Sequence, residues 1–309
     1  MKQAGVPTAS FEVFETAPDA LAYLAAATYP IVIKADGDAA GKGVVVAASL
    51  EEAQDAITRI MVTREFGASG DKVVIEACLN GPEASLMAFV DGDTVVPMLL
   101  AQDHKRIGEG DTGPNTGGMG AVSPVPYVDA VLMEKIETRI VKPTIDGFQK
   151  DGIPYKGFVF IGLINVKGEP IVIEYNVRMG DPETEVVIPR LKTDLVELFL
   201  AVANEKLDQI ALEVDERSAT TIMVVSGGYP EEFEKGKVIS GLENITDSIV
   251  FHAGTKLENN QVLSNGGRVL TVTSYGDNFE EAIKKSYQNI AKLQFDKMYF
   301  RRDIGNDLK

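Results

Sequence analysis

Two short β-branched runs flank a glycine-containing loop between residues 30 and 48, and this order limits the folds open to the chain. Residues 30–35 and 44–48 are predicted strands, and the loop between them holds Gly37, Gly41 and Gly43. A P-loop needs four residues between its first glycine and the Gly-Lys pair, then Ser or Thr. Only three residues intervene here, and Gly43 stands in place of the hydroxyl. The segment is therefore not a P-loop.

A dinucleotide-binding fingerprint also fails for this segment. It needs a third Gly or Ala where Val46 stands, and a helix where the second strand is predicted. What remains is a hairpin with Lys34 on its first strand and Lys42 in its loop. Such a hairpin can fold over a triphosphate, offering backbone N–H groups and two ammonium charges. A surface hairpin with incidental lysines explains the same residues equally well.

A second candidate site lies at the end of the apolar run Ile171-Val172-Ile173, where Glu174-Tyr175-Asn176 follows. Residues two apart on a strand point to the same face, so Glu174 and Asn176 are expected to project together. Carboxylate and amide oxygens suit Mg²⁺, which completes its shell with waters and phosphate oxygens. Arg178 could hold a transferring phosphoryl group with its planar guanidinium. A solvated strand end is the alternative, and the lysine hairpin favours the metal site.

Residues 101–126 show no helical or strand periodicity and are predicted to form a long loop. Six glycines fall between Gly108 and Gly120, which permits close approach of the backbone to a ligand. Lys105 and Arg106 add positive charge just before them. We therefore favour a substrate loop over a disordered one.

The chain has only two histidines, so Ser–His and multi-histidine zinc chemistry are disfavoured. His104, in the predicted loop, is expected to be structural or solvated, and His252, in a predicted strand, to lie in the core. Three acids, Asp181, Glu183 and Glu185, follow the proposed metal site. They could grip an ammonium substrate or cap the following helix, and both roles remain open.

The rest of the chain alternates between predicted helices and strands. The expected helices are 49–66, 127–150 with a break near Pro143, 194–205 and one from residue 278. The expected strands are 72–76, 84–90, 94–100, a hairpin of 158–165 with 170–175, 220–225, 248–253 and 269–275. A charged stretch at 208–218 suggests a boundary before a small C-terminal α+β domain.

Composition narrows the partners and the compartment. The net charge of −16 makes nucleic acid an unfavourable partner, and the chain has no apolar run of about 20 residues that would span a membrane. The N-terminus lacks the apolar region of a signal peptide. The single cysteine, Cys78, cannot form an internal disulfide, which fits a cytoplasmic setting.

The chain resembles the phosphoribosylamine–glycine ligase (glycinamide ribonucleotide synthetase) family of the ATP-grasp superfamily over its full length. The motifs that carry the resemblance are IKADGDAAGKGV, DHKRIGEGDTGPNTGGMGA, VIEYNVRMGDPETE, FHAGTK and NGGRVL. The resemblance implies an α+β ATP-grasp fold and a two-step reaction with Mg²⁺ or Mn²⁺. ATP phosphorylates the carboxylate of glycine, and the amine of 5-phosphoribosylamine attacks the glycyl phosphate. Glycinamide ribonucleotide, ADP and phosphate result, in de novo purine biosynthesis.

The resemblance also implies residue roles. The residues expected to contact ATP are Lys34, Gly41, Lys42, Gly43, Glu76, Leu79 and Glu83. The expected metal ligands are Glu174 and Asn176. The residues expected to face the reacting groups are Lys105, Arg106, Arg178 and Asp181. The residues expected to bind substrate are Asp111, Thr112, Gly113, Pro114, Asn115, Thr116, Gly117 and Gly118. Ala77 departs from the family pattern, which has a second acid there, but adenine contacts in this segment can come from the backbone.

The implied organisation has three parts. Residues 1–79 would form the ATP-grasp lid subdomain, 80–213 the main subdomain with the metal and substrate loops, and 214–309 the C-terminal domain. The family pattern begins with a further αβ domain ahead of the position where this chain starts. One expectation is therefore a fragment that binds nucleotide but turns over slowly or not at all. Another ATP-grasp carboxylate–amine ligase is the remaining alternative.

Overall fold

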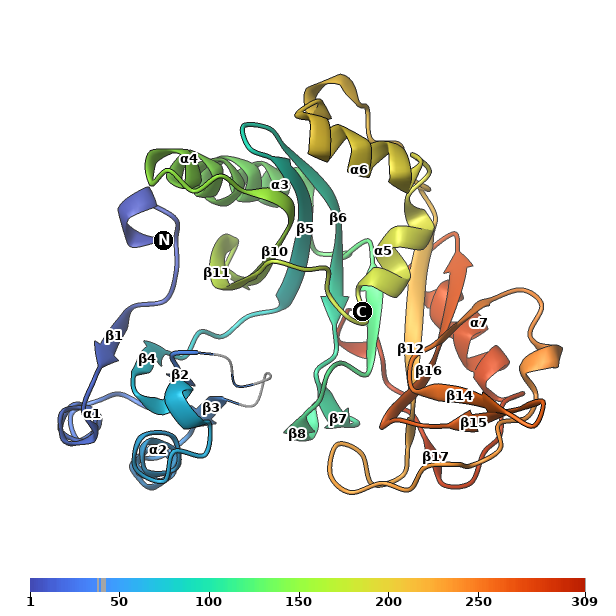
Figure 1. Ribbon diagram of the computed structural model, residues 1–309, viewed down its shortest axis with the longest axis horizontal. Coiled ribbons are helices and arrows are strands. Elements are labelled where there is room, and N and C mark those ends of the chain that lie inside the picture. Colours follow the sequence, from blue (N-terminus) through green and yellow to red (C-terminus); the bar gives the residue numbers. More distant parts are fainter. Residues whose placement is uncertain (38, 40–42, 309) are drawn as a thin grey trace.

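The computed structural model describes residues 1–37, 39 and 43–308. Near the N-terminus it forms a four-stranded antiparallel sheet. Its strands are β1 (Phe11–Phe14), β2 (Ile31–Ala35), β3 (Val44–Ala47) and β4 (Val73–Ala77). They lie in the order β1-β4-β2-β3, with helices α1 (Ala17–Leu24) and α2 (Leu50–Ile57) beside them (Figure 1).

Period-two burial explains how this small sheet packs on its helices. Ile31 and Ile33 on β2, with Ile75 on β4, are buried against Leu24 and Ile57 of the two helices. Burying each such side chain stabilises the fold by about 1.5–3 kcal/mol. The predicted start of α2 is confirmed by its cap, because the backbone N–H of Glu52 donates to the Ser49 hydroxyl at 3.3 Å.

A nine-stranded antiparallel sheet forms the rest of the framework. Its strands are β5 (Glu83–Asp91), β6 (Val95–Asp103), β9 (Gly120–Ser123), β10 (Lys156–Val166), β11 (Glu169–Asn176), β12 (Ser218–Ser226), β13 (Ile249–His252), β16 (Arg268–Gly276) and β17 (Met298–Tyr299). Their order is β11-β10-β5-β6-β9-β12-β16-β13, and β17 pairs with β12. β9 therefore joins the strands of the middle of the chain to those of its C-terminal part.

Helices cover both faces of this sheet (Figure 1). They are α3 (Ala130–Ile136), α4 (Lys142–Lys150), α5 (Thr184–Arg190), α6 (Leu195–Asn204) and α7 (Phe279–Ile290). Along β5, Leu86 and Val90 pack in the cluster that contains α3 and α4, whereas Met87 and Phe89 pack in the cluster that contains α5 and α6. This alternation is what a strand buried on both faces requires. α7 packs on β12 and β16, and no helix among the described residues is long and apolar enough to cross a membrane.

The hairpin predicted around Lys167-Gly168 is confirmed by the pairing of β10 with β11. The prediction of a long loop at 101–126 is wrong. Besides the end of β6, that segment contains β7 (Arg106–Gly108), β8 (Thr112–Asn115) and β9. Strands of three or four residues are too short to show a periodicity, and glycines have no side chain that would contribute to an apolar–polar alternation.

Two further differences concern helices and the N-terminus. In place of the predicted break near Pro143 there is a short π-helical segment at Glu137–Val141, through which α3 continues into α4. β1 and α1 were not predicted. Ahead of them, Thr8 bridges to Val172, so the first residues run along the outer edge of β11.

Candidate active site

The predicted metal pair lies at the end of β11, next to β10. Glu174 pairs with Gly162 and Asn176 with Phe160, so the two side chains leave the strand on the same side, as their spacing predicts. Glu174 is exposed and Asn176 is half-buried. A Cβ atom at Gly162 would lie 3.0 Å from Cγ of Glu174, so this glycine leaves room for the carboxylate.

Lys34 connects the small sheet to this strand. Its ammonium donates to the carbonyl of Ile173 at 3.3 Å and pairs with Oε2 of Glu76 at 2.7 Å. The contact places a lysine of β2 directly beside the residue before Glu174. Gly43 lies just before β3, and its carbonyl accepts from Ala35 N at 2.9 Å. Gly41 and Lys42, also predicted to contact ATP, lie outside the described residues.

Lys105 supplies a second positive charge close to the same strand. Its ammonium lies 2.5 Å from Oε2 of Glu83. Burial works against its charge, but Glu83, Asp103 and Glu174 outweigh burial and raise the pKa of Lys105 above its ordinary value. Lys105 is therefore a charged lysine within electrostatic range of the proposed metal ligand.

Two of the remaining predicted residues lie at the margin of this group. The Arg178 side chain is exposed, donates to the carbonyl of Met179 at 2.9 Å, and lies 6.0 Å from the ring centroid of Phe160. Leu79 is half-buried in the segment that joins β4 to β5.

The structure brings the Lys105-Arg106 pair together with the end of the glycine-rich segment. Thr116 donates to the carbonyl of Lys105 through both its backbone N–H, at 2.7 Å, and its hydroxyl, at 2.9 Å. The same hydroxyl accepts from Gly118 N at 2.9 Å. Arg106 donates to the carbonyl of Gly113 at 2.7 Å, across the β7–β8 hairpin. By contrast, residues 112–115 are exposed along β8, and Asp111 is paired with Arg301 at 2.6 Å.

Arg268 and Tyr229, which were not predicted as site residues, hold the next part of this segment. Arg268 donates to the carbonyl of Gly117 at 2.5 Å and pairs with the carboxylate of Asp181 at 2.7 Å. The Tyr229 hydroxyl accepts from Gly117 N at 3.0 Å. Arg268 lies within the NGGRVL motif, and this motif was the sequence feature that could have identified it as a site residue.

Carboxylates gather on the other side of Gly118. Glu183 is buried and accepts from the Ser85 hydroxyl at 2.8 Å. Burial raises the pKa of Asp103 well above its usual range, and the neighbouring charge of Glu183 raises it further. Burial also raises the pKa of Glu183. Glu183 precedes α5 but makes no capping hydrogen bond with its side chain. Glu183 therefore does not cap α5 through its side chain, and its binding of an ammonium group stays a prediction.

Burial and the nearby charge of Asp181 raise the pKa of Glu185 from 4.5 to about 7, so the stability of the protein should depend on pH. Between these values the folded protein holds a proton that the unfolded chain has released, so stability falls as pH rises through this window. Glu185→Gln removes the effect. The unfolding free energy of the variant minus that of the unsubstituted protein should be about 1–3 kcal/mol larger at about pH 8 than at about pH 5. One pKa unit corresponds to ~1.4 kcal/mol, and partial exposure of Glu185 reduces the effect by screening its charge. Urea unfolding at both pH values measures this, and an equal difference at both would contradict it.

The histidines have structural surroundings. His104 is 3% exposed and its Nε2 lies 3.0 Å from Oδ1 of Asp307, in accord with a structural role. The prediction that His252 lies in the core is wrong, because its side chain is exposed and its Nδ1 lies 2.9 Å from the Thr255 hydroxyl. It is near the end of an edge strand, where a strand pattern alone does not distinguish the two faces.

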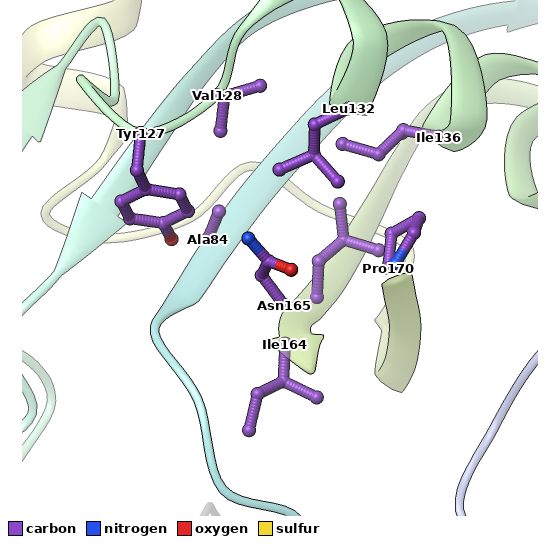
Figure 2. A pocket seen from close by; sticks show the side chains of 9 residues that line it. Ala84, Tyr127, Val128, Leu132, Ile136, Ile164, Asn165 and Pro170 are labelled. Carbon is purple, nitrogen blue, oxygen red and sulfur yellow. The ribbon is translucent and has the colours of Figure 1, made fainter. Parts of the chain in front are cut away.

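A small pocket lies between α3 and the sheet, next to Ala84 of β5 (Figure 2). It is lined mainly by apolar side chains, among them Leu132, Ile136 and Leu163, with the amide of Asn165 at one edge. The Asn165 amide oxygen already accepts from Gly168 N at 2.8 Å. This pocket has the character of a packing gap, so we place the candidate site at Glu174 instead.

The donor set at β11 fits a magnesium-type ion shared with phosphates. In the part of the chain that the structure describes, no group of three or more His, Cys, Asp or Glu side chains is arranged to hold a metal. One carboxylate with one amide suits an ion that keeps several waters and phosphate oxygens in its shell.

Comparisons with known proteins show which family the chain belongs to. Residues 1–184 match the family model of the phosphoribosylglycinamide synthetase ATP-grasp (A) domain, and residues 219–307 match that of its C domain. The phosphoribosylamine–glycine ligase of Chlorobaculum tepidum is 47% identical over 99% of this chain and 73% of that protein. The bifunctional purine biosynthetic protein PUR2,5 of Pichia angusta is 48% identical over 99% of this chain, which spans only 39% of that protein.

A solved structure gives the same result for the fold. The phosphoribosylamine–glycine ligase of Thermotoga maritima superposes with a TM-score of 0.90 at 36% identity, covering 98% of this chain and 76% of that one. The biotin carboxylase domain of the Hydrogenobacter thermophilus 2-oxoglutarate carboxylase, at 15% identity and a TM-score of 0.71, shares the fold alone. The expected α+β ATP-grasp fold is confirmed, and the chain belongs to the phosphoribosylamine–glycine ligase family.

Proposed function

We propose that this chain carries out the ATP-dependent ligation of glycine to 5-phosphoribosylamine. The observation that carries the proposal is the contact of Lys34 with the carbonyl of Ile173. This contact brings a lysine of one sheet to the strand that presents Glu174 and Asn176 from the other sheet. An ammonium group on one sheet and a pair able to hold a divalent metal on the other could together hold the phosphates of a nucleotide. The relatives of this family are named phosphoribosylamine–glycine ligases, which supplies the reaction.

ATP would lie between the two sheets. Lys34 and the segment of Gly41, Lys42 and Gly43 would contact its phosphates, as paired ammonium and backbone N–H groups do in other phosphate sites. Glu76, Leu79 and Glu83 line the connection between the sheets and would face adenine and ribose. In the structure Glu76 and Glu83 pair with Lys34 and Lys105. Nucleotide binding would exchange the ion pair of Lys34 for a phosphate contact, whereas Lys105 would act on the phosphoryl group only as it is transferred.

Glu174 and Asn176 would hold a divalent metal, Mg²⁺ or Mn²⁺. Bound there, the metal supplies charge neutralisation for the phosphates. The residues of the chain around it position the reactants. Arg178 would orient the transferring phosphoryl group with its planar guanidinium, and Lys105 would offset the charge that develops on it.

The substrates would lie toward Gly118. The carboxylate of glycine takes the γ-phosphoryl group of ATP, releasing ADP, and the amine of 5-phosphoribosylamine then attacks the acyl carbon and expels phosphate. Arg106, Asp181 and residues 111–118 would bind these substrates, with the carboxylates near Gly118 placed to face an amine. Because an acyl phosphate hydrolyses in water, the small sheet would have to exclude water for the lifetime of the glycyl phosphate.

The three-part division follows from the same proposal. Residues 1–79 would act as the lid, 80–213 would carry the metal and substrate residues, and 214–309 would form the C-terminal domain. The extent of the small sheet, from residue 11 to residue 77, supports the first boundary. We further propose small molecules as the partners, since the net charge of −16 opposes nucleic acid. The lone Cys78 favours a cytoplasmic setting.

Lys34→Ala is expected to weaken ATP binding about 10- to 100-fold, because a charged hydrogen-bond partner of a phosphate contributes about 1.5–3 kcal/mol. Isothermal titration with a non-hydrolysable ATP analogue measures it. Lys72→Ala is the matched control, because Lys72 precedes β4 of the same sheet and pairs with Glu15 at the surface. An unaltered dissociation constant in Lys34→Ala would remove this lysine from the nucleotide site.

The proposed reaction is tested by phosphate release with Mg–ATP, glycine and 5-phosphoribosylamine. Omitting each substrate in turn should abolish release, and mass spectrometry should find glycinamide ribonucleotide. Turnover with a different carboxylate or amine, but not with this pair, would point to another ligase of the superfamily. ATP binding with no turnover of any pair would leave a nucleotide-binding module and overturn the proposal.

A further inference from the structure

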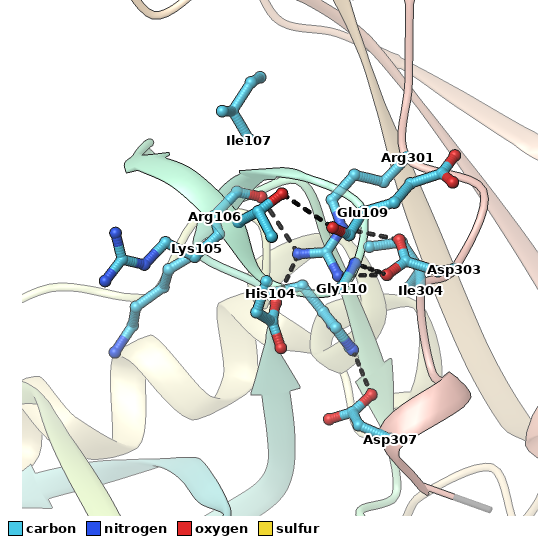
Figure 3. A network of polar contacts seen from close by, with 12 residues as sticks. His104, Lys105, Arg106, Ile107, Glu109, Gly110, Arg301, Asp303, Ile304 and Asp307 are labelled. Atoms are coloured by element: carbon cyan, nitrogen blue, oxygen red, sulfur yellow. Dashed lines mark hydrogen bonds and ion pairs between the residues drawn. The ribbon is translucent and has the colours of Figure 1, made fainter.

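The C-terminal segment (residues 299–307) returns from the far end of the chain to the β7–β8 hairpin (Figure 3). Arg301, in this segment, is 1% exposed and is one of the largest fully buried side chains among the described residues. A guanidinium is costly to bury unless most of its donors are satisfied. The partners of Arg301 therefore indicate what the segment is built to hold.

Arg301 binds the first strand of the hairpin and the turn after it. Nη1 donates to the carbonyl of Arg106 at 3.1 Å and lies 2.6 Å from Oδ1 of Asp111. Nε and Nη2 each donate to the Asp303 carboxylate at 2.8 Å. Asp303 in turn accepts from Gly110 N at 2.7 Å. One buried fork thus fixes the first residue of β7 and the turn that follows it.

Two further residues of the C-terminal segment bind the chain on either side of Lys105 and Arg106. The Tyr299 hydroxyl donates to the carbonyl of Ile107 at 3.0 Å. Asp307 lies 3.0 Å from Nε2 of His104 and also accepts from Gln102. The residues on both sides of Lys105 and Arg106 are therefore bound to the C-terminal segment, while the side chains of those two residues point elsewhere (Figure 3).

We propose that Arg301 is a positioning residue for Lys105 and Arg106. It acts through the backbone of Arg106 and the carboxylate of Asp111, and it fixes where the two cations stand relative to the substrates. The proposal rests on the function proposed above for Lys105 and Arg106. Only a planar fork reaches Arg106, Asp111 and Asp303 together, so lysine is not an adequate replacement.

The test is Arg301→Lys, which keeps the charge and loses the fork. The kcat/KM for 5-phosphoribosylamine is expected to fall about 10- to 100-fold, the size of effect that a displaced positioning group causes. The ATP dissociation constant should change by less than about twofold, because Lys34 shares no contact with Arg301. Hydrogen exchange of the amides in residues 107–112 should become faster. Arg302→Lys is the matched control, since Arg302 is the next residue, is exposed, and lies 5.5 Å from the Phe300 ring centroid.

Each outcome decides the proposal. Unchanged kcat/KM with unchanged exchange of the hairpin amides overturns it, and so does an equal loss of ATP affinity, which would indicate general damage. If Arg301→Lys does not fold, Asp303→Asn weakens the contacts of Asp303 with Arg301 and with Gly110 N, and it is judged by the same measurements. If the unsubstituted protein turns over no substrate, the proposed function fails, and hydrogen exchange alone then decides whether Arg301 holds the hairpin.

Discussion

Glu174→Ala is expected to lower kcat at saturating ATP, glycine and metal by about a thousandfold or more, since it removes the charged member of the proposed metal-ligand pair at the reacting phosphate. The side chain is exposed at the end of β11, so the free energy of unfolding should change by less than about 0.5 kcal/mol. Steady-state phosphate release and thermal melting measure the two quantities. An unchanged kcat would remove Glu174 from the metal site.

Glu169→Ala is the control for this experiment. Glu169 begins the same strand at its other end and pairs with Lys135 at 2.8 Å and with Arg139 at the surface. Exposed pairs of this kind contribute about 0–1 kcal/mol. The variant should therefore keep full activity and lose little stability, which separates loss of the metal ligand from loss of an acidic residue on β11.

Gly118→Ala is expected to reduce kcat/KM by about 100-fold and the unfolding free energy by about 2–4 kcal/mol. Gly118 has φ +109, and an added Cβ would lie 2.3 Å from Cδ of Pro182 and 2.7 Å from Oδ1 of Asp103. A proline ring cannot rotate away, so the 116–118 segment must move, and with it the hydrogen bonds of Thr116 to Lys105. Chemical denaturation and substrate kinetics together measure the effect.

Gly236→Ala is the matched control, because Gly236 has φ +81 but nothing within 4 Å of an added Cβ. It shares the backbone strain of Gly118→Ala, about 1 kcal/mol, without the steric contact. Equal losses of stability and equal activity in the two variants would show that the contact with Pro182 and Asp103 is unimportant.

Local pattern was enough to predict part of this molecule. The β10–β11 hairpin and the shared face of Glu174 and Asn176 follow from period-two alternation and a Lys-Gly turn. The β7–β8 hairpin could not be predicted in this way, because its strands are short and held by partners distant in sequence, notably Arg301. Burial pattern along one segment carries no information about such partners.

The candidate site, too, could be predicted from the sequence only in part. The lysine of β2 and the acid of β11 were recognisable as residue types, but their proximity depends on how two separate sheets pack. Arg268 and Tyr229 were missed as site residues because each acts on Gly117 from more than a hundred residues away. Residue chemistry indicated which groups could bind a phosphate, whereas only the fold shows which of them meet.

The position of β9 has a mechanical consequence. Because β9 is hydrogen-bonded to both β6 and β12, the sheet is continuous from the strand of Glu174 to the C-terminal strands. Among the described residues, no strand of the small sheet is paired with it. We infer that opening of the proposed site would rotate the small sheet against the large one, about the connections at residues 9–10 and 78–82, because Thr8 is still bridged to Val172. The C-terminal strands would then move together with β11, because both belong to the same hydrogen-bonded sheet.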